Sequence, residues 1–266
     1  MKYLTIGQID ATGIKGPHEK ELEDIVRNKI TIFKNLDINK LSGFVNKNLG
    51  GKIKNIGLDE DWTITLRLFP EVNINILYFY YGNEFDDINA ELKVLFSGER
   101  AYWIPGEDLA TYIEIIMYFL ERNIKNKGTV DQEYNEKSDL LLKAFEQRKS
   151  LFKFLEKENI IELKSFLGAD IKKSNTEWKF KKEIFLEIFI KIIFSINEDK
   201  LDISYSGKNL KKIEKYHIEL IVIFIINHIL RFVTINNQGK ELPNICYMMF
   251  SRLFTKEKGW DYRNLS

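Results

Sequence analysis

The acidic and aromatic residues near position 80 are the strongest candidates for chemistry in this sequence. Glu84, Asp86 and Asp87 follow the aromatic run 78–81 and a Gly-Asn turn, so carboxylates and phenols are expected at one strand end. Carboxylates held close together share a proton or bind a hard cation. The spacing does not match an EF-hand loop, and a solvated turn is the simpler interpretation of the same residues. A second acidic cluster lies at 59–61.

The histidines and the cysteine offer little to a metal site or to nucleophilic catalysis. His217 and His228 fall on one predicted helix, about 16 Å apart at 1.5 Å rise per residue, which is too far for one metal ion. His18 lies in a loop-like N-terminal stretch, and Cys246 lies in the apolar stripe of the last predicted helix. A lone buried cysteine acts as a small hydrophobic residue. We therefore predict no catalytic residue, no bound metal and no cofactor.

The composition and the absence of known motifs argue against several further classes of function. The 266 residues include 40 basic and 39 acidic side chains, and the resulting net charge of +1 gives no general reason to expect a nucleic-acid partner. One cysteine excludes an intramolecular disulfide framework and Cys-cluster metal sites. The sequence contains no P-loop, dinucleotide-binding, zincin, nucleophile-elbow or thioredoxin motif.

No targeting or membrane segment is predicted. The N-terminal stretch lacks the apolar region of a secretory signal. The most apolar stretch, Ile218–Val233, is interrupted by Glu219 and Arg231, whereas a membrane span needs about 20 apolar residues. We interpret this stretch as a buried core helix and expect a cytoplasmic protein without a membrane partner.

The sequence repeats itself at an offset of about 110–118 residues. Short segments recur in the same order, and the offset changes only where loops can differ in length. The pairs are 49–54 with 167–172, Trp62 with Trp178, 69–76 with 185–192, 92–98 with 201–207, and the apolar helices 109–122 with 218–231. We infer a tandem duplication.

Each copy is interpreted as an α-β-β-β-α unit. Apolar residues at helical spacing across 19–48 predict helices with a break near 35–37. Three segments rich in β-branched and aromatic residues, 61–68, 72–81 and 90–96, predict strands. In the second copy a helix is predicted over 138–157.

The predicted fold class is α+β, with mainly antiparallel sheets, helices packed on them and a pseudo-two-fold relation between the copies. Residues 1–128 form the first predicted unit, and residues 129–266 form the second together with a C-terminal helix over 242–255. Because adjacent copies can cover each other's apolar surfaces, we expect one fused globular body.

The stretch from Leu49 to Arg122 resembles an uncharacterised family of bacterial and archaeal anaerobe proteins, known only as a domain of unknown function. The family pattern contains LGG, FP, GDEEFP, LFD and EDL. The matching residues are Leu49-Gly50-Gly51, Phe69-Pro70, Glu84-Phe85, Leu95-Phe96, and Tyr102 with Glu107-Asp108-Leu109. The resemblance covers about 75 of the 266 residues and extends weakly to the second copy.

Departures from that pattern limit what the resemblance implies. The GDEEFP segment becomes Gly82-Asn83-Glu84-Phe85-Asp86, and the aspartate after Leu-Phe becomes Ser97. The resemblance therefore implies a shared fold and keeps Glu84 as one acidic member, but it supplies no reaction. Some relatives are encoded near corrinoid and one-carbon systems, which implies an accessory role.

Our leading hypothesis is a non-enzymatic cytoplasmic accessory or binding protein that recognises a protein partner through a groove between the two units. Aromatic residues beside charges are common at interface hot spots. The candidate binding residues are Tyr80, Tyr81, Glu84, Asp86, Asp87 and Trp103. Nothing in the sequence identifies the partner or sets an oligomeric state.

Two other classes stay open. A metal-dependent enzyme would use Glu84, Asp86 and Asp87 around a divalent cation, which requires these carboxylates to converge within about 5 Å. An immunity or antagonist protein of a mobile-element conflict would show the same poverty of motifs.

Overall fold

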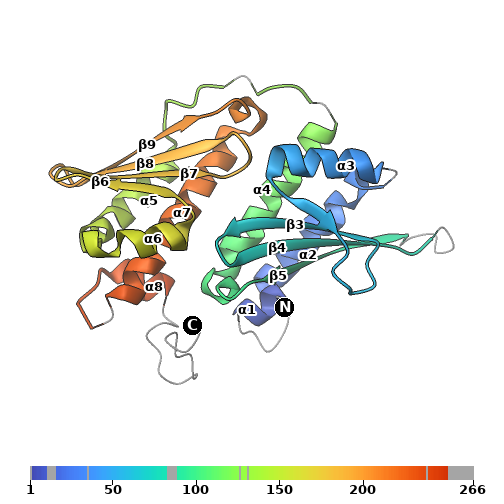
Figure 1. Cartoon of the computed structure of the whole chain (residues 1–266), viewed down its shortest axis with the longest axis horizontal. Helices are drawn as coiled ribbons and strands as arrows, with labels where there is room; N and C mark the ends of the chain where they lie inside the picture. Colours follow the sequence, from blue (N-terminus) through green and yellow to red (C-terminus); the bar gives the residue numbers. More distant parts are fainter. Residues whose placement is uncertain are drawn as a thin grey trace. The chain divides into compact units, whose positions relative to one another are not determined.

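A computed structural model of the chain describes residues 2–10, 16–34, 36–82, 89–125, 127–130, 132–237 and 239–250. The fold is α+β, with two antiparallel sheets and helices (Figure 1). The chain divides into two compact units. Unit 1 comprises Met1–Asp131, Ile184–Ile188 and Gly207–Glu214, and unit 2 comprises Gln132–Glu183, Phe189–Ser206 and Lys215–Ser266.

Unit 1 contains a five-stranded sheet with helices packed on it. The strands, in spatial order, are β1 (Tyr3–Leu4), β5 (Ala90–Ser97), β4 (Val72–Tyr80), β3 (Trp62–Phe69) and β2 (Lys52–Lys54). The helical segments are α1 (Ile6–Asp10), α2 (Pro17–Lys29), η1 (Ile30–Ile32), α3 (Ile38–Phe44), η2 (Val45–Leu49), η3 (Ala101–Trp103), α4 (Gly106–Ile124) and η6 (Leu210–Lys212). Helix α2 packs against both α4 and β5.

Unit 2 contains a four-stranded sheet in simple sequence order. The strands are β6 (Asp170–Lys173), β7 (Glu177–Glu183), β8 (Phe189–Ser195) and β9 (Lys200–Ser206). The helical segments are α5 (Asp139–Arg148), η4 (Lys149–Phe154), η5 (Lys157–Asn159), α6 (Ile160–Leu167), α7 (Lys215–Asn236) and α8 (Asn244–Met249).

The two units share backbone details at the positions that the predicted duplication makes equivalent. The turn between β3 and β4 holds Glu71 at φ 62°, and the turn between β7 and β8 holds Glu187 at φ 61°. After the last strand of each copy, Gly98 and Gly207 have φ of 110° and 125°. Each glycine lies directly against the carbonyl oxygen of its glutamate. The equivalent residues therefore close the same turn in the same way.

The structure adds strands that the α-β-β-β-α interpretation missed. Each copy begins its sheet with a short strand, β2 or β6, and unit 1 also has the two-residue β1. These segments are too short to show a clear alternation of apolar and polar residues. The predicted helix over 138–157 is also interrupted, because α5 ends at Arg148 and η4 follows. This tighter turn buries the consecutive residues Leu151 and Phe152.

Helix α7 is a core helix of unit 2, as predicted for residues 218–233. It is long and apolar enough to cross a membrane, but 89% of its most apolar window is buried, which is consistent with a soluble protein. Its buried polar residues have partners within the unit. The carboxylate of Glu219 accepts a hydrogen bond from the Ser138 backbone N–H at 3.1 Å, and Asn227 accepts one from Arg148 at 2.8 Å.

Two short segments from the second half of the chain complete unit 1. The N–H of Leu186 donates to the carbonyl oxygen of Asn48 at 3.0 Å, and Lys212 donates to the Asn48 side chain at 3.0 Å. The ring of Phe185 packs 4.7 Å from that of Phe119 on α4, measured between centroids. The boundary predicted between residues 128 and 129 did not anticipate these segments.

A candidate binding groove between α2 and β5

Helix α2 forms one wall of a groove in unit 1. Proline is tolerated in the first helical turn, so Pro17 begins the helix, and Glu19 in the same turn suits the positive end of the helix dipole. The apolar residues Leu22 and Val26 recur at a spacing of four, are buried, and line one cavity together with residues of β5. The half-buried Ile30 continues this face.

Strand β5 forms the other wall, and most of its outer edge is open. On its inner side it pairs with β4 along its whole length, whereas β1 pairs only with Phe96 and Ser97. The N–H of Tyr81 donates to the carbonyl oxygen of Asn89, and backbone groups alternate along an antiparallel pair. The backbone groups of Ala90, Leu92 and Val94 therefore point away from β4.

These outward backbone groups have no partner among the described residues. They line a cavity of about 750 Å³ between α2 and β5, within the usual range for ligand sites. The apolar residues that line it are Ile6, Leu22, Val26, Ile30, Ala90, Leu92, Val94 and Leu95. The groove thus combines an apolar lining with unused backbone donors and acceptors.

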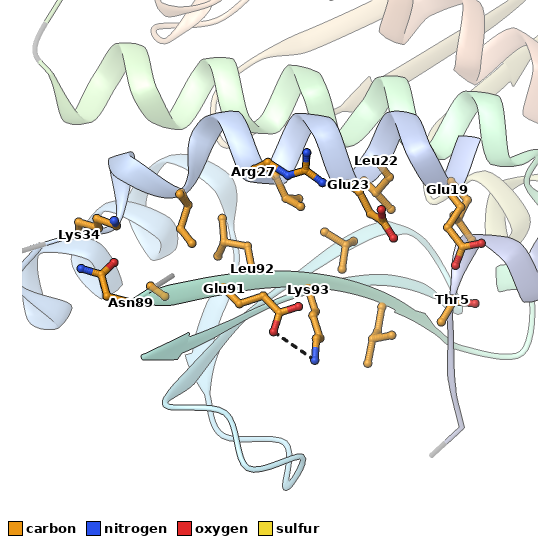
Figure 2. A pocket seen from close by; sticks show the side chains of 16 residues that line it. Thr5, Glu19, Leu22, Glu23, Arg27, Lys34, Asn89, Glu91, Leu92 and Lys93 are labelled. Carbon is orange, nitrogen blue, oxygen red and sulfur yellow. Dashed lines mark ion pairs between the residues drawn. The ribbon is translucent and has the colours of Figure 1, made fainter. Parts of the chain in front are cut away.

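Charged residues give the groove two different ends (Figure 2). Glu19 and Glu23 lie toward the end that contains Thr5. Lys34 lies at the opposite end with Asn89, and Arg27 lies between Lys34 and Glu23, where it forms an exposed ion pair with Asp24 at 3.6 Å. One end of the groove is therefore acidic and the other basic.

The face of β5 that points away from α2 carries its own polar contacts. The side chains of Glu91 and Lys93 point away from α2 and form an ion pair at 3.3 Å (Figure 2). The phenol of Tyr81 donates to the Glu91 carboxylate at 2.6 Å, and this hydrogen bond raises the pKa of the phenol. Lys93 also lies 4.9 Å from the centroid of the Phe79 ring.

An ion cluster holds α2 on α4. The Glu121 carboxylate on α4 accepts hydrogen bonds from Lys125 at 2.8 Å and from Lys29, at the end of α2, at 2.5 Å. These two bonds lower the pKa of Glu121 to about 2. The Glu121 side chain is only 17% exposed, so solvent screens the cluster weakly.

Replacing Glu121 with glutamine is expected to lower the free energy of unfolding by about 2 kcal/mol at pH 7. A carboxylate whose pKa is lowered by folding stabilises the native state above its unfolded pKa near 4.5. That stabilisation is lost as the pH falls toward about 2. Urea unfolding from pH 7 to pH 2 should show the wild type and Glu121→Gln converging. Glu114→Gln on the same helix is the control, and an equal loss there would contradict the prediction.

The structure describes only three of the six residues that the sequence grouped into one site: Tyr80, Tyr81 and Trp103. Tyr80 and Tyr81 lie together at the end of β4, exposed by 48% and 44%. Glu84, Asp86 and Asp87 lie outside the described residues. Trp103 lies in η3, beyond the opposite end of β5, which is about 23 Å long at 3.3 Å per residue. Trp103 therefore does not join the two tyrosines.

The histidines and the cysteine occupy structural positions. His18 Nδ1 lies 2.8 Å from Asp10, and the buried His228 ring stacks on Phe166 with 4.2 Å between centroids. Burial raises the pKa of the Cys246 thiol, although a hydrogen bond with Thr234 opposes this, so the thiol is poorly suited to act as a nucleophile. Across the described ranges, no three His, Cys, Asp or Glu residues are grouped so as to hold a metal ion.

The groove was missed because it depends on packing between residues far apart in the sequence. A usable signal was nevertheless present on α2. Charged residues recur every four positions at Glu19, Glu23 and Arg27, beside the apolar row of Leu22 and Val26. This pattern is typical of a helix whose charged side borders an apolar surface.

A scan against protein-family models, a search of curated proteins and a search of solved structures each found no match for this chain. The resemblance to the domain of unknown function, carried by residues 49–122, therefore stays a prediction.

Proposed function

We propose that this chain is a non-enzymatic, cytoplasmic binding protein that receives a protein partner in the groove between α2 and β5. The observation that carries the proposal is the cavity of about 750 Å³, which has an apolar lining and a charged rim. Apolar pockets with a few well-placed polar groups are the usual form of a binding site. The accessory role implied by the family resemblance agrees with this proposal.

The exposed tyrosines provide a second contact surface next to the groove. Tyr80 is the last residue of β4, and Tyr81, which follows it, donates its N–H to the carbonyl oxygen of Asn89 just before β5. Tyrosine supplies large contact area together with a polar tip, and it is enriched at interface hot spots. A partner seated at the basic end of the groove would lie close to Tyr80, which pairs with Ala90, whereas Tyr81 lies on the opposite face with Glu91.

Selection of displayed random peptides against the full-length chain tests the proposal. Selected peptides are expected to bind Ile30→Asp, in the groove lining, at least about tenfold more weakly than the wild type, which corresponds to 1.4 kcal/mol. The matched control is Ile161→Asp, because Ile161 on α6 is 79% exposed and lies in unit 2. This control is expected to bind as the wild type does.

Thermal unfolding of Ile30→Asp establishes whether the variant folds. If Ile30→Asp does not fold, the variant Lys34→Glu is tested in its place. Lys34 is exposed at the rim of the groove, so this change leaves the apolar lining intact. A failure to select any binding peptide would contradict the proposal. So would selected peptides that bind folded groove variants as tightly as the wild type.

A further inference from the structure

We propose that the groove binds its partner by strand addition: an extended peptide segment pairs antiparallel with the open edge of β5 beneath α2. This inference rests on the proposed function and adds to it the conformation, direction and charge of the bound segment. Strand addition to an exposed sheet edge is a general mode of peptide recognition, in which backbone hydrogen bonds supply affinity and side-chain pockets supply specificity.

The open edge has the length and the hydrogen-bonding pattern that an added strand needs. Residues Ala90–Leu95 lie beyond the reach of β1 and extend over about 17 Å at 3.3 Å per residue. Ala90, Leu92 and Val94 are only 5–8% exposed, yet their outward backbone groups lack partners within the described part of the chain. Buried backbone groups are nearly always paired, so this edge favours a ligand that pairs with it.

Asn89 adds an independent observation at the basic end of the groove. Its side-chain oxygen Oδ1 is buried and has no hydrogen-bond partner among the described residues. A buried acceptor without a partner carries a free-energy cost of about 1–3 kcal/mol. A backbone or side-chain N–H of a bound segment would remove that cost.

The existing strand pairing sets the direction of the added strand. β1 already pairs antiparallel with Phe96 and Ser97, so a segment bound farther along the same edge in the same sense would continue the line of β1. Its N-terminus would then lie at the acidic end, beside Glu19 and Glu23, and its C-terminus at the basic end, beside Lys34. Charge complementarity favours a segment that begins with a basic residue, alternates apolar and polar residues, and ends with an acidic residue.

The probe is the peptide Lys-Val-Thr-Val-Thr-Val-Glu, blocked at both ends, and its control is Glu-Val-Thr-Val-Thr-Val-Lys. The first peptide is expected to bind the full-length chain at least about tenfold more tightly. A double variant, Glu23→Arg with Arg27→Glu, exchanges the two charges on α2 without changing the net charge. Because Glu19 and Lys34 keep their charges, each end of the groove then carries one charge of each sign, and this variant is expected to lose the preference for the first peptide. Equal binding of both peptides to both proteins would overturn the charge assignment and the direction.

Alternate N-methylation of the probe tests the backbone pairing. Because donors alternate along an antiparallel pair, methylating one alternate set of peptide nitrogens should abolish binding, while methylating the other set should be tolerated. Hydrogen exchange at the amides of Ala90, Leu92 and Val94 should also slow in the complex. The amides of Glu91 and Lys93 already face β4 and should change little.

The outcomes separate this inference from the proposed function. If selected peptides bind in the groove but neither methylated set weakens the probe, strand addition is wrong and the proposed function stands. If no peptide binds, both fail. Sedimentation without peptide gives a further outcome: concentration-dependent self-association that protects the same three amides would assign the edge to a second copy of the chain and overturn the peptide assignment.

Discussion

Replacing Gly98 with alanine is expected to lower the free energy of unfolding by at least about 3 kcal/mol. An added Cβ at this position would lie 2.0 Å from the Glu71 carbonyl oxygen, which is far inside van der Waals contact. The backbone φ of 110° adds strain for any residue with a side chain. Relief of the overlap would require the β3–β4 turn to move away from the end of β5.

The second copy provides an internal replicate of this test. At Gly207 an added Cβ would lie 1.9 Å from the Glu187 carbonyl oxygen, so Gly207→Ala should be about as harmful. The control is Gly239→Ala, where φ is 97° but no atom lies within 4 Å of the added Cβ. It should lose only about 1–2 kcal/mol from backbone strain. Urea unfolding of the three variants measures this, and equal losses throughout would show that the close approach has no effect.

Replacing Glu60 with glutamine is expected to lower the free energy of unfolding by about 2–4 kcal/mol at pH 7. The carboxylate is 3% exposed and accepts hydrogen bonds from the backbone N–H groups of Ile56 and Leu58 and from the Thr63 hydroxyl. A glutamine offers one acceptor oxygen, and its NH₂ group would face a backbone donor. The loop that leads into β3 would lose the side chain that organises it.

The destabilisation by Glu60→Gln should depend on pH. Burial by itself raises the pKa of the Glu60 carboxyl, but its hydrogen bonds outweigh that effect and lower the pKa below its usual value. Its stabilising contribution is therefore complete above the unfolded pKa near 4.5 and is lost as the pH falls through the lower folded value. Unfolding measured at pH 7 and at pH 3 should show the difference from wild type shrinking. The exposed neighbour Asp59, changed to asparagine, should alter stability by less than about 0.5 kcal/mol at either pH.

The duplication was predictable because it rests on local features that each copy repeats. Gly98 and Gly207 mark a close approach between two backbones, a position that excludes any side chain. The apolar helices after them are long enough to show a clear period, so α4 and α7 were both anticipated. Short strands such as β2 carry too few residues for any pattern.

The candidate site was less predictable, because aromatic and acidic residues occur at many surface positions that bind nothing. Tyr80 and Tyr81 are indeed exposed, but Trp103 follows the far end of β5. The groove forms because α2 packs against β5 and because β1 pairs with only part of the β5 edge. Neither contact can be recognised from the local sequence. Only the row of charged residues along α2 indicated that an apolar surface lies beside this helix.

The dependence of unit 1 on Ile184–Ile188 and Gly207–Glu214 has a consequence for synthesis on the ribosome. Folding of the N-terminal half cannot finish when Asp131 emerges, because the residues that pack on Phe119 and bond to Asn48 come later. About 80 further residues must be made, a wait of roughly 4–16 s at 5–20 residues per second. Until those residues are made, Phe119 has its neighbour Phe44 but lacks its contact with Phe185. Folding of unit 1 is therefore completed only after residues from the second half of the chain have been synthesised.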